Sequence, residues 1–271
     1  MHICEHFYSL QGEGKHIGIP SYFIRLSGCP LRCKFCDSKF AWNVGANDIK
    51  IENELDMRKF YTDNIYGRDV RHIVFTGGEP LSKDNYKTLF EFIKFLTKRN
   101  TFLKAYTFTI ETTGIVDPSK IVGNNIIDVL LELDNEFNPE ELEEDSLDNI
   151  TLSISPKFNM CAYKDFPEVT KQSLYNYYSL KGMSLRNYSF DNVYYKFVHT
   201  SHAGADISNF VAGHILEKFK DNIFVMPVTN IPYVESEYNG NCKQVANFCK
   251  ENCLRYSPRL HIDLWGLMKG V

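Results

Sequence analysis

Short apolar runs recur along the chain, and their spacing gives the first structural prediction. Each run is four to six residues long and rich in Val, Ile, Phe or Tyr, which is typical of a buried or half-buried strand. The YFIRL run is expected to be the first strand. In chain order the runs are YFIRL (22–26), HIVF (72–75), AYTFTI (105–110), IIDVLL (126–131), ITLSI (150–154), VYYKFV (193–198), IFVMPV (223–228) and LHIDLW (260–265).

Helical patterns lie between several of these runs. Residues 83–99 place apolar side chains on one stripe at helical spacing, and residues 205–219 do the same. Because strands alternate with helices, the sequence predicts an α/β fold with a parallel sheet of βα units, either open or rolled into a barrel. We find no internal repeat or linker that would divide the chain, so residues 1–271 are expected to form a single domain.

Two segments have the composition of insertions. Residues 132–149 hold nine acidic residues and no Lys or Arg, which predicts a solvated, mobile loop. Residues 158–192 are rich in Tyr, Asn and Lys and contain a predicted helix near 167–181.

Charge and composition exclude several classes of protein. The 271 residues carry 30 Lys and Arg against 34 Asp and Glu, a net charge of −4. That balance argues against binding nucleic acid through bulk electrostatics, which requires a basic surface. The opening MHICEHFYSL lacks the basic start of a signal peptide, and no stretch approaches ~18 continuous apolar residues. We therefore expect a cytoplasmic protein without membrane contact, whose eight cysteines stay reduced.

The stretch GCPLRCKFCDS carries three cysteines in one loop, at Cys29, Cys33 and Cys36. A structural zinc site needs four ligands, and the chain offers no second close pair. Three thiolates instead suit a 4Fe-4S cluster that leaves one iron open. The downstream cysteines are expected on one face of a helix, as small apolar residues in a core contact: Cys242, Cys249 and Cys253.

Two further motifs follow predicted strands. In TGGEP, Gly77 and Gly78 would let backbone approach a ligand, while Glu79 could assist binding or brace the turn. In SISPK, Ser155 and Lys157 bring a hydroxyl and a positive charge to the carboxyl edge of the sheet, where ligand sites of α/β proteins lie. An ordinary turn with a surface lysine is the alternative.

Together these motifs resemble the radical S-adenosylmethionine superfamily. Within it, the stretch from FYSLQGEG to FCDS resembles the opening of the 7-carboxy-7-deazaguanine synthase (QueE) family. TGGEPL, ETTG, SPK, KFV and the ending RLHIDLWGLMKGV also match, so the resemblance spans the chain. It implies a partial (βα)6 barrel that converts 6-carboxy-5,6,7,8-tetrahydropterin to 7-carboxy-7-deazaguanine with loss of ammonia, using a 4Fe-4S cluster, S-adenosylmethionine and Mg²⁺. It also implies an external electron donor such as a flavodoxin, and a homodimer.

The resemblance also assigns residues to roles. The cluster is held by Cys29, Cys33 and Cys36, and S-adenosylmethionine contacts Phe35, Asp37, Gly78, Glu79, Ser155, Pro156 and Lys157. The substrate contacts Leu10, Gln11, Gly12, Glu13, Arg25, Thr76, His261 and Val271. The magnesium ligand is Ser38, where the family usually has Thr; the hydroxyl is kept, but the methyl that fixes its rotamer is lost.

Some assignments stay open at the level of sequence. Arg25 lies within an apolar strand and needs an anionic partner, either a substrate carboxylate or an internal Asp or Glu. His261 is either a substrate contact or a hydrogen-bonded core residue. Three other functions remain possible for the whole chain: an activase of glycyl-radical enzymes, a family member with a different substrate, and a non-catalytic iron–sulfur or zinc module that binds a partner.

Overall fold

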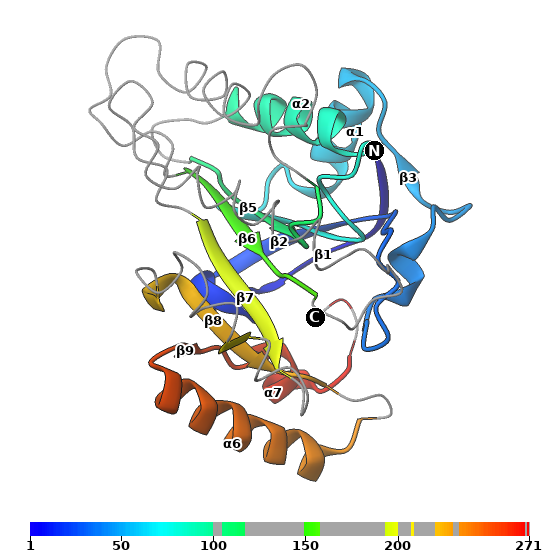
Figure 1. Ribbon diagram of the computed structural model, residues 1–271. Coiled ribbons are helices and arrows are strands. Elements are labelled where there is room, and N and C mark those ends of the chain that lie inside the picture. Colours follow the sequence, from blue (N-terminus) through cyan, green and yellow to red (C-terminus); the bar gives the residue numbers. More distant parts are fainter. Residues whose placement is uncertain are drawn as a thin grey trace.

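The computed structural model describes residues 1–99, 105–116, 149–157, 193–199, 207–208, 220–229, 233–268 and 270. In this part of the chain nine strands form one sheet in the order β3-β1-β2-β4-β5-β6-β7-β8-β9 (Figure 1). Their bounds are β1 His2–Leu10, β2 Pro20–Leu26, β3 Ile49–Lys50, β4 His72–Gly77, β5 Thr107–Thr112, β6 Ile150–Ile154, β7 Val193–His199, β8 Ile223–Pro227 and β9 Arg255–Tyr256.

Six neighbouring strands form a parallel core. From β2 through β4, β5, β6 and β7 to β8, every pair is parallel, and the short β9 adds a further parallel pair at the β8 edge. The other edge is antiparallel, because β1 pairs with both β2 and β3 in that sense. The predicted α/β fold with about six strands in a partial barrel is confirmed.

Alternation along each parallel strand separates the core from the site. In β2, Tyr22, Ile24 and Leu26 join the main hydrophobic core, while Phe23 and Arg25 line a pocket. In β7 likewise, Tyr195 and Phe197 join the core while Lys196 and Val198 line the pocket, because side chains of a strand point alternately to its two faces. The apolar set therefore fixes which residues are left to face the pocket.

Four α-helices complete the described part of the chain: α1 Glu54–Asn64, α2 Tyr86–Thr97, α6 Glu235–Asn252 and α7 Leu260–Trp265. In Figure 1, α1 and α2 lie together on one side of the sheet, and α6 lies beside β8 and β9. Two 3-10 turns are η1 Gly14–His16 and η2 Lys39–Trp42. No described helix is both long enough and apolar enough to cross a membrane.

Three sequence predictions are wrong. LHIDLW forms α7 rather than a strand, because a six-residue apolar run fits either element and only its packing decides. YFIRL is the second strand, because β1 precedes it. The side chains of β1 are mostly part-exposed, so β1 does not form a continuous apolar run. Cys253 does not share a helical face with Cys249; it ends α6 in the left-handed conformation, at φ 53°, and is exposed.

Several other predictions lie outside the described residues. These are the predicted strand at 126–131, most of the predicted helix at 205–219, the helix near 167–181, and both insertions apart from Asn149.

A buried polar cluster lies at the amino ends of β4 and β5, and we call it the amino-end cluster: His16, His72, Thr107 and Thr109. His72 Nδ1 lies 2.7 Å from Thr107 Oγ1, and its Nε2 lies 3.0 Å from Thr109 Oγ1. His16 Nδ1 is 3.0 Å from the same Thr109 oxygen. Burial lowers the pKa of His72 to about 3 and that of His16 to about 4, so both rings are neutral near pH 7.

Candidate active site

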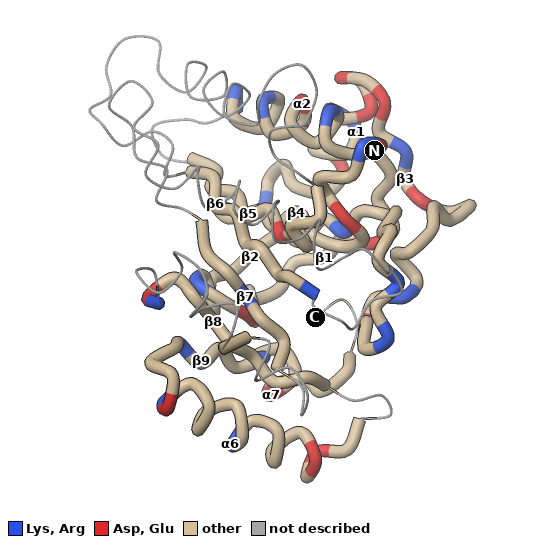
Figure 2. The backbone as a smooth tube through the Cα atoms, in the orientation of Figure 1, with Lys and Arg blue, Asp and Glu red and all other residues tan. Residues whose placement is uncertain are grey.

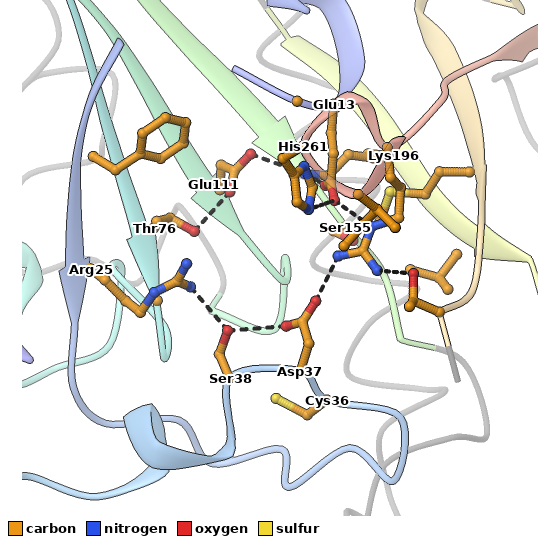
Figure 3. Close-up of a pocket in the computed structure, with 18 of the residues that line it drawn as sticks. Glu13, Arg25, Cys36, Asp37, Ser38, Thr76, Glu111, Ser155, Lys196 and His261 are labelled. Atoms are coloured by element: carbon orange, nitrogen blue, oxygen red, sulfur yellow. Dashed lines mark hydrogen bonds and ion pairs between the residues drawn. The ribbon is translucent and has the colours of Figure 1, made fainter. Parts of the chain in front are cut away.

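One pocket of about 520 Å³ opens at the carboxyl ends of the parallel strands and collects most of the predicted site residues (Figure 3). The ends of β2, β4, β5, β7 and β8 contribute to it, as do the loop after β1, the cysteine loop and α7. The predicted site residues that line the pocket are Leu10, Gln11, Gly12, Glu13, Arg25, Cys29, Cys33, Phe35, Cys36, Asp37, Ser38, Thr76, Gly78, Ser155, Lys157 and His261.

Three predicted site residues are not among the lining residues. Glu79 and Pro156 are buried next to the pocket without lining it. Val271 lies outside the described residues, although Gly270 lines the pocket.

Backbone hydrogen bonds anchor the start of the cysteine loop and close a turn within it. The Cys29 N–H donates to Trp42 O at 3.1 Å, and the Cys36 N–H donates to Cys33 O at 3.2 Å. Cys33 is buried against Leu31. These contacts hold the three cysteines of the motif against one pocket, although they are seven residues apart at most.

The three thiols suit a cluster better than a single ion. None of the three forms a disulfide, and burial raises the pKa of Cys29, so binding a cationic centre would have to drive its deprotonation. Among the described residues no three His, Cys, Asp or Glu side chains converge on one metal-ion position. A 4Fe-4S cube takes each thiolate at a separate iron, so it does not need the three sulfur atoms to meet at one point. The donor set therefore fits the cluster.

The TGGEP turn brings β4 against the cysteine loop. A Cβ on Gly78 would overlap the backbone carbonyl of Gly28, so only glycine fits there. Glu79 is fully buried and its carboxylate accepts hydrogen bonds from Thr112 Oγ1 at 2.6 Å and from the Thr113 N–H at 2.9 Å. Of the two sequence interpretations, this geometry supports bracing of the turn by Glu79.

SPK ends β6 with a charged group at the pocket. Lys157 Nζ donates to Ser155 Oγ at 2.6 Å, and the ammonium lies 5.9 Å from the centre of the Phe35 ring. Within the described part of the chain Lys157 has no carboxylate partner. Its positive charge is therefore available to an anionic ligand.

The QGEG loop packs against α7. A Cβ on Gly12 would overlap the His261 ring, and the Leu260 N–H donates to Gly12 O at 2.9 Å. The QGEG loop therefore lies against the imidazole ring of His261. His261 lines the pocket. Burial lowers the pKa of its imidazole, although the nearby Glu13 carboxylate acts to raise it, so the ring is neutral near pH 7.

Glu13 is the centre of an ion-pair network that we call the carboxyl-end network: Glu13, Asp37, Glu111, Lys196 and Arg259. The side chains of this network are largely buried except that of Asp37, which is 47% exposed. Lys196 Nζ lies 2.8 Å from Glu13 and 2.9 Å from Glu111. Arg259 lies 2.8 Å from Glu13 and 2.6 Å from Asp37. The network therefore joins β5, β7, the QGEG loop, the cysteine loop and the residue before α7.

Electrostatics keep this network charged. Burial alone would raise the pKa of Glu13, but Lys196, Arg259 and His261 together hold it well below its usual range. Burial would lower the pKa of Lys196, but Glu111 and Glu13 raise it instead. Burial would likewise lower the pKa of Arg259, but Glu13 and Asp37 raise it. Each charge persists because an opposite charge touches it.

Sequence reasoning assigned three members of this network no contact with substrate, cofactor or metal, although Glu111 and Lys196 stand within the matched ETTG and KFV motifs. Glu111, Lys196 and Arg259 all line the pocket. Glu111 also accepts a hydrogen bond from Thr76 Oγ1 at 2.7 Å, which orients that predicted substrate contact. Lys196 had a detectable signal, because it is a charge inside the apolar run VYYKFV, as Arg25 is inside YFIRL.

Arg25 has an internal acidic partner. Its Nε lies 2.8 Å from Glu5 Oε2, and Nη1 donates to Ser38 Oγ at 3.1 Å. Ser38 Oγ in turn donates to Asp37 Oδ1 at 3.0 Å. Figure 3 shows Arg25, Ser38 and Asp37 linked in a row above Cys36. Glu5 is therefore the internal anion that the sequence left as an alternative, yet Arg25 still lines the pocket.

Comparison with known proteins gives concordant matches. Residues 10–153 match the family of 4Fe-4S single-cluster domains. A 7-carboxy-7-deazaguanine synthase of Pyrobaculum aerophilum is 26% identical over 271 residues, covering 99% of this chain and 96% of that protein.

Two solved structures share the fold. QueE from Escherichia coli superposes with a TM-score of 0.56 at 22% identity, over 96% of this chain and 94% of that one. His6-tagged anSMEcpe with bound AdoMet superposes with a TM-score of 0.50 at 16% identity, over 89% of this chain and 62% of that one.

Proposed function

We propose that this chain, which belongs to the family of 4Fe-4S single-cluster domains and to the 7-carboxy-7-deazaguanine synthase (QueE) family, is a radical S-adenosylmethionine lyase. Its reaction is the conversion of 6-carboxy-5,6,7,8-tetrahydropterin to 7-carboxy-7-deazaguanine with loss of ammonia. One observation carries the proposal: the three cysteines of the C-x3-C-x2-C motif line the same pocket as the QGEG loop and the carboxyl ends of the strands.

Cys29, Cys33 and Cys36 would hold the cluster next to bound S-adenosylmethionine. Together the two cofactors would supply the radical chemistry that abstracts hydrogen from the substrate. The protein's own task is to hold the reacting atoms in position and to exclude water and other hydrogen donors. The hydrogen bonds of the cysteine loop and the QGEG loop hold these two loops beside the pocket.

The cofactor contacts follow from what each group offers. The backbone at Gly78 can receive the ammonium of S-adenosylmethionine, because no side chain stands in the way there. Lys157 offers a positive charge to the carboxylate of S-adenosylmethionine, and Ser155 offers a hydroxyl to its ribose. Phe35 and Asp37 line the pocket, whereas Glu79 and Pro156 are buried beside it and would act by shaping it.

The substrate contacts are proposed in the same pocket. Gln11 and Glu13 face the pocket and can pair with the guanidine-like edge of a pterin, with Leu10, Gly12, Thr76 and His261 around it. Arg25 would grip the substrate carboxylate with the part of its guanidinium that Glu5 does not occupy. Val271 remains a proposed contact.

Magnesium is proposed as a weakly held ion at Ser38. The Ser38 hydroxyl and the adjacent Asp37 carboxylate supply hard oxygen atoms of the kind that Mg²⁺ prefers. Because Arg25 already donates to Ser38, we expect the ion to bind together with an anionic substrate rather than before it. We further propose a homodimer in the cytoplasm that accepts electrons from an external donor such as a flavodoxin.

Anaerobic reconstitution tests the function. The holoenzyme is incubated with the carboxypterin, S-adenosylmethionine, dithionite and Mg²⁺, and products are measured by mass spectrometry. We expect 7-carboxy-7-deazaguanine, and none when S-adenosylmethionine is left out. Formation of 5′-deoxyadenosine without the deazaguanine would instead assign a different substrate, including the protein substrate of an activase. A colourless, zinc-loaded protein stable in air would replace the enzyme with a binding module.

A further inference from the structure

Arg259 is a buried residue whose guanidinium reaches three separate segments of the chain. Its Nε donates to Glu13 Oε1 at 2.8 Å, Nη1 to Thr229 Oγ1 at 2.6 Å and Nη2 to Asp37 Oδ2 at 2.6 Å. Glu13 belongs to the QGEG loop, Asp37 to the cysteine loop, and Thr229 follows β8. One side chain therefore ties together three parts of the pocket wall that are far apart in sequence.

The backbone fixes the place from which this side chain starts. Arg259 O accepts hydrogen bonds from the N–H groups of Ile262 at 2.8 Å and Asp263 at 3.0 Å, in the first turn of α7. The next residue, Leu260, donates its N–H to Gly12 O at 2.9 Å. The guanidinium of Arg259 is therefore held both at its base and at its tip.

The contacts of Arg259 continue into a chain of polar groups along the pocket. Asp37 Oδ1 accepts from Ser38 Oγ at 3.0 Å, and Ser38 Oγ accepts from Arg25 Nη1 at 3.1 Å. The chain begins at Glu13, which is proposed to pair with the pterin edge, and ends at Arg25, which is proposed to grip the substrate carboxylate. In Figure 3, Arg25 and Glu13 lie at different sides of the drawn site, with Asp37 and Ser38 below both.

Charge alone does not explain this arrangement. Charged residues of both signs lie among the strands at the centre of Figure 2 as well as on the outer helices. Glu13 already has a cation beside it, since Lys196 Nζ lies 2.8 Å from its carboxylate. What Arg259 adds is geometry, because a guanidinium is a planar fork whose donors point in fixed directions, whereas a lysine offers one compact charge.

Resting on the proposed function, we infer that Arg259 is a positioning residue that sets the place of the substrate relative to the cofactor. It acts through Glu13 on the substrate side and through Asp37 on the cofactor side. Each of its three nitrogen atoms already donates to a protein group, so it works through these partners rather than by contacting the substrate. Placement matters to the rate, because an error of about 1 Å between reacting groups can cost about a hundredfold.

Two substitutions of Arg259 separate its geometry from its charge. Arg259→Lys keeps the positive charge, but a single ammonium cannot hold all three partners at once. Arg259→Gln removes the charge as well. The matched controls are Arg255→Lys and Arg255→Gln, because Arg255 is an exposed arginine on the nearby β9 that donates to Asp221 O at 3.1 Å. Arg255 is outside the set of described residues that line the pocket.

The first measurement compares how tightly the two products of the reconstituted holoenzyme are coupled. 5′-Deoxyadenosine and 7-carboxy-7-deazaguanine are quantified together by mass spectrometry. For Arg259→Lys we expect kcat to fall at least roughly tenfold, and the ratio of 5′-deoxyadenosine to deazaguanine to rise at least roughly tenfold, because misplaced substrate lets S-adenosylmethionine be cleaved without product formation. The KM for the carboxypterin should change less than about threefold, since the variant keeps its substrate contacts.

The second measurement, hydrogen exchange followed by mass spectrometry, needs no turnover. It is made on the anaerobic holoenzyme without substrate, at residues 11–14 of the QGEG loop and residues 36–41 of the cysteine loop. We expect Arg259→Gln to speed exchange in both segments by at least about threefold, and Arg255→Gln to change neither. If Arg259→Gln does not fold, Arg259→Lys carries both measurements.

Three results would overturn the inference. An unchanged product ratio and full activity in Arg259→Lys would show that only the charge matters. A higher KM with an unchanged ratio would make Arg259 a direct substrate contact. Unchanged exchange in both segments would show that the guanidinium does not hold the two loops. Failure of the proposed function has a different signature, since the wild type would then make no deazaguanine while hydrogen exchange still reported whether Arg259 holds the loops.

Discussion

The two ends of the parallel strands bury polar groups in opposite ways. At the carboxyl ends, carboxylates and cations contact one another and stay charged, and all of them except Asp37 are largely buried. At the amino ends, two histidines contact threonine hydroxyls and stay neutral. Burial disfavours charge in both places, so the difference comes from the partner: an opposite charge outweighs desolvation, and a hydroxyl does not. The charged groups at the carboxyl ends can meet a charged ligand, whereas the neutral histidines at the amino ends contribute to the fold.

The largest effect is expected from breaking the carboxyl end at the cluster. Cys33→Ala should abolish the brown colour of the reconstituted protein and all turnover, because the cluster would lose one of its three ligands. Visible absorbance and product formation measure the two losses. The hydrogen bonds of the amino-end cluster should be unaffected by this substitution.

Cys249→Ala is the matched control, since Cys249 is also buried and its burial raises the pKa of the thiol to about 11. This thiol lies on α6 and packs in the hydrophobic core, so its removal should leave colour and turnover largely intact. Bleaching of Cys249→Ala would show that the ligands were assigned to the wrong cysteines.

A smaller but still large effect is expected at Lys196. Lys196→Met removes the cation shared by Glu13 and Glu111 and leaves their charges buried, which should lower the free energy of unfolding by about 3–5 kcal/mol. Chemical denaturation measures the change. Lys196→Met/Glu111→Gln should recover part of the stability, because one stranded charge is gone, but should not recover turnover.

Lys243→Met serves as the reference for this measurement, because Lys243 is exposed on α6. Its effect should stay within about 0.5 kcal/mol. If Lys196→Met were equally mild, the carboxylates would not depend on Lys196 for their charge.

The amino end should respond to pH instead. In the unfolded chain a histidine takes up a proton below about pH 6.5. The folded chain does not protonate His16 until about pH 4 or His72 until about pH 3. The unfolded state therefore binds more protons in this window, so stability should fall by a few kcal/mol as the pH drops from about 6.5 to about 4.5.

Denaturant unfolding at a series of pH values checks this, with His16→Gln/His72→Gln as the comparison. The slope in this window should be shallower in the variant. The Glu13 contribution has the opposite origin, because its pKa is held low, and it is lost only at lower pH. An unchanged slope in the variant would assign the acid sensitivity to other groups.

Much of the fold could be predicted because the parallel strands carry continuous apolar runs. Six of the eight predicted runs overlap described strands, and in them the alternation of core and pocket residues follows from the period of a strand. LHIDLW failed for a physical reason: six residues are too few for strand and helix periods to differ, and packing against the QGEG loop decided for a helix.

The site was predictable where its residues are neighbours in sequence. The cysteine motif, QGEG and SPK each concentrate their chemistry in a few residues. Arg259 gave no comparable signal, because its acidic partners Glu13 and Asp37 lie 246 and 222 residues away along the chain. Lys196 was visible as a charge in an apolar run, but its partners were not.

The sequence by itself determined which ligands the protein can offer: three thiols on one loop, glycines where backbone must come close, and apolar stripes that turn the remaining side chains into a pocket. Only the tertiary structure decided which charges meet. Ion pairs between distant segments depend on the packing that brings β5, β7 and the residue before α7 together around Glu13. Local patterns carry no information about that packing, because a strand's period fixes the direction of a side chain but not the neighbour it finds.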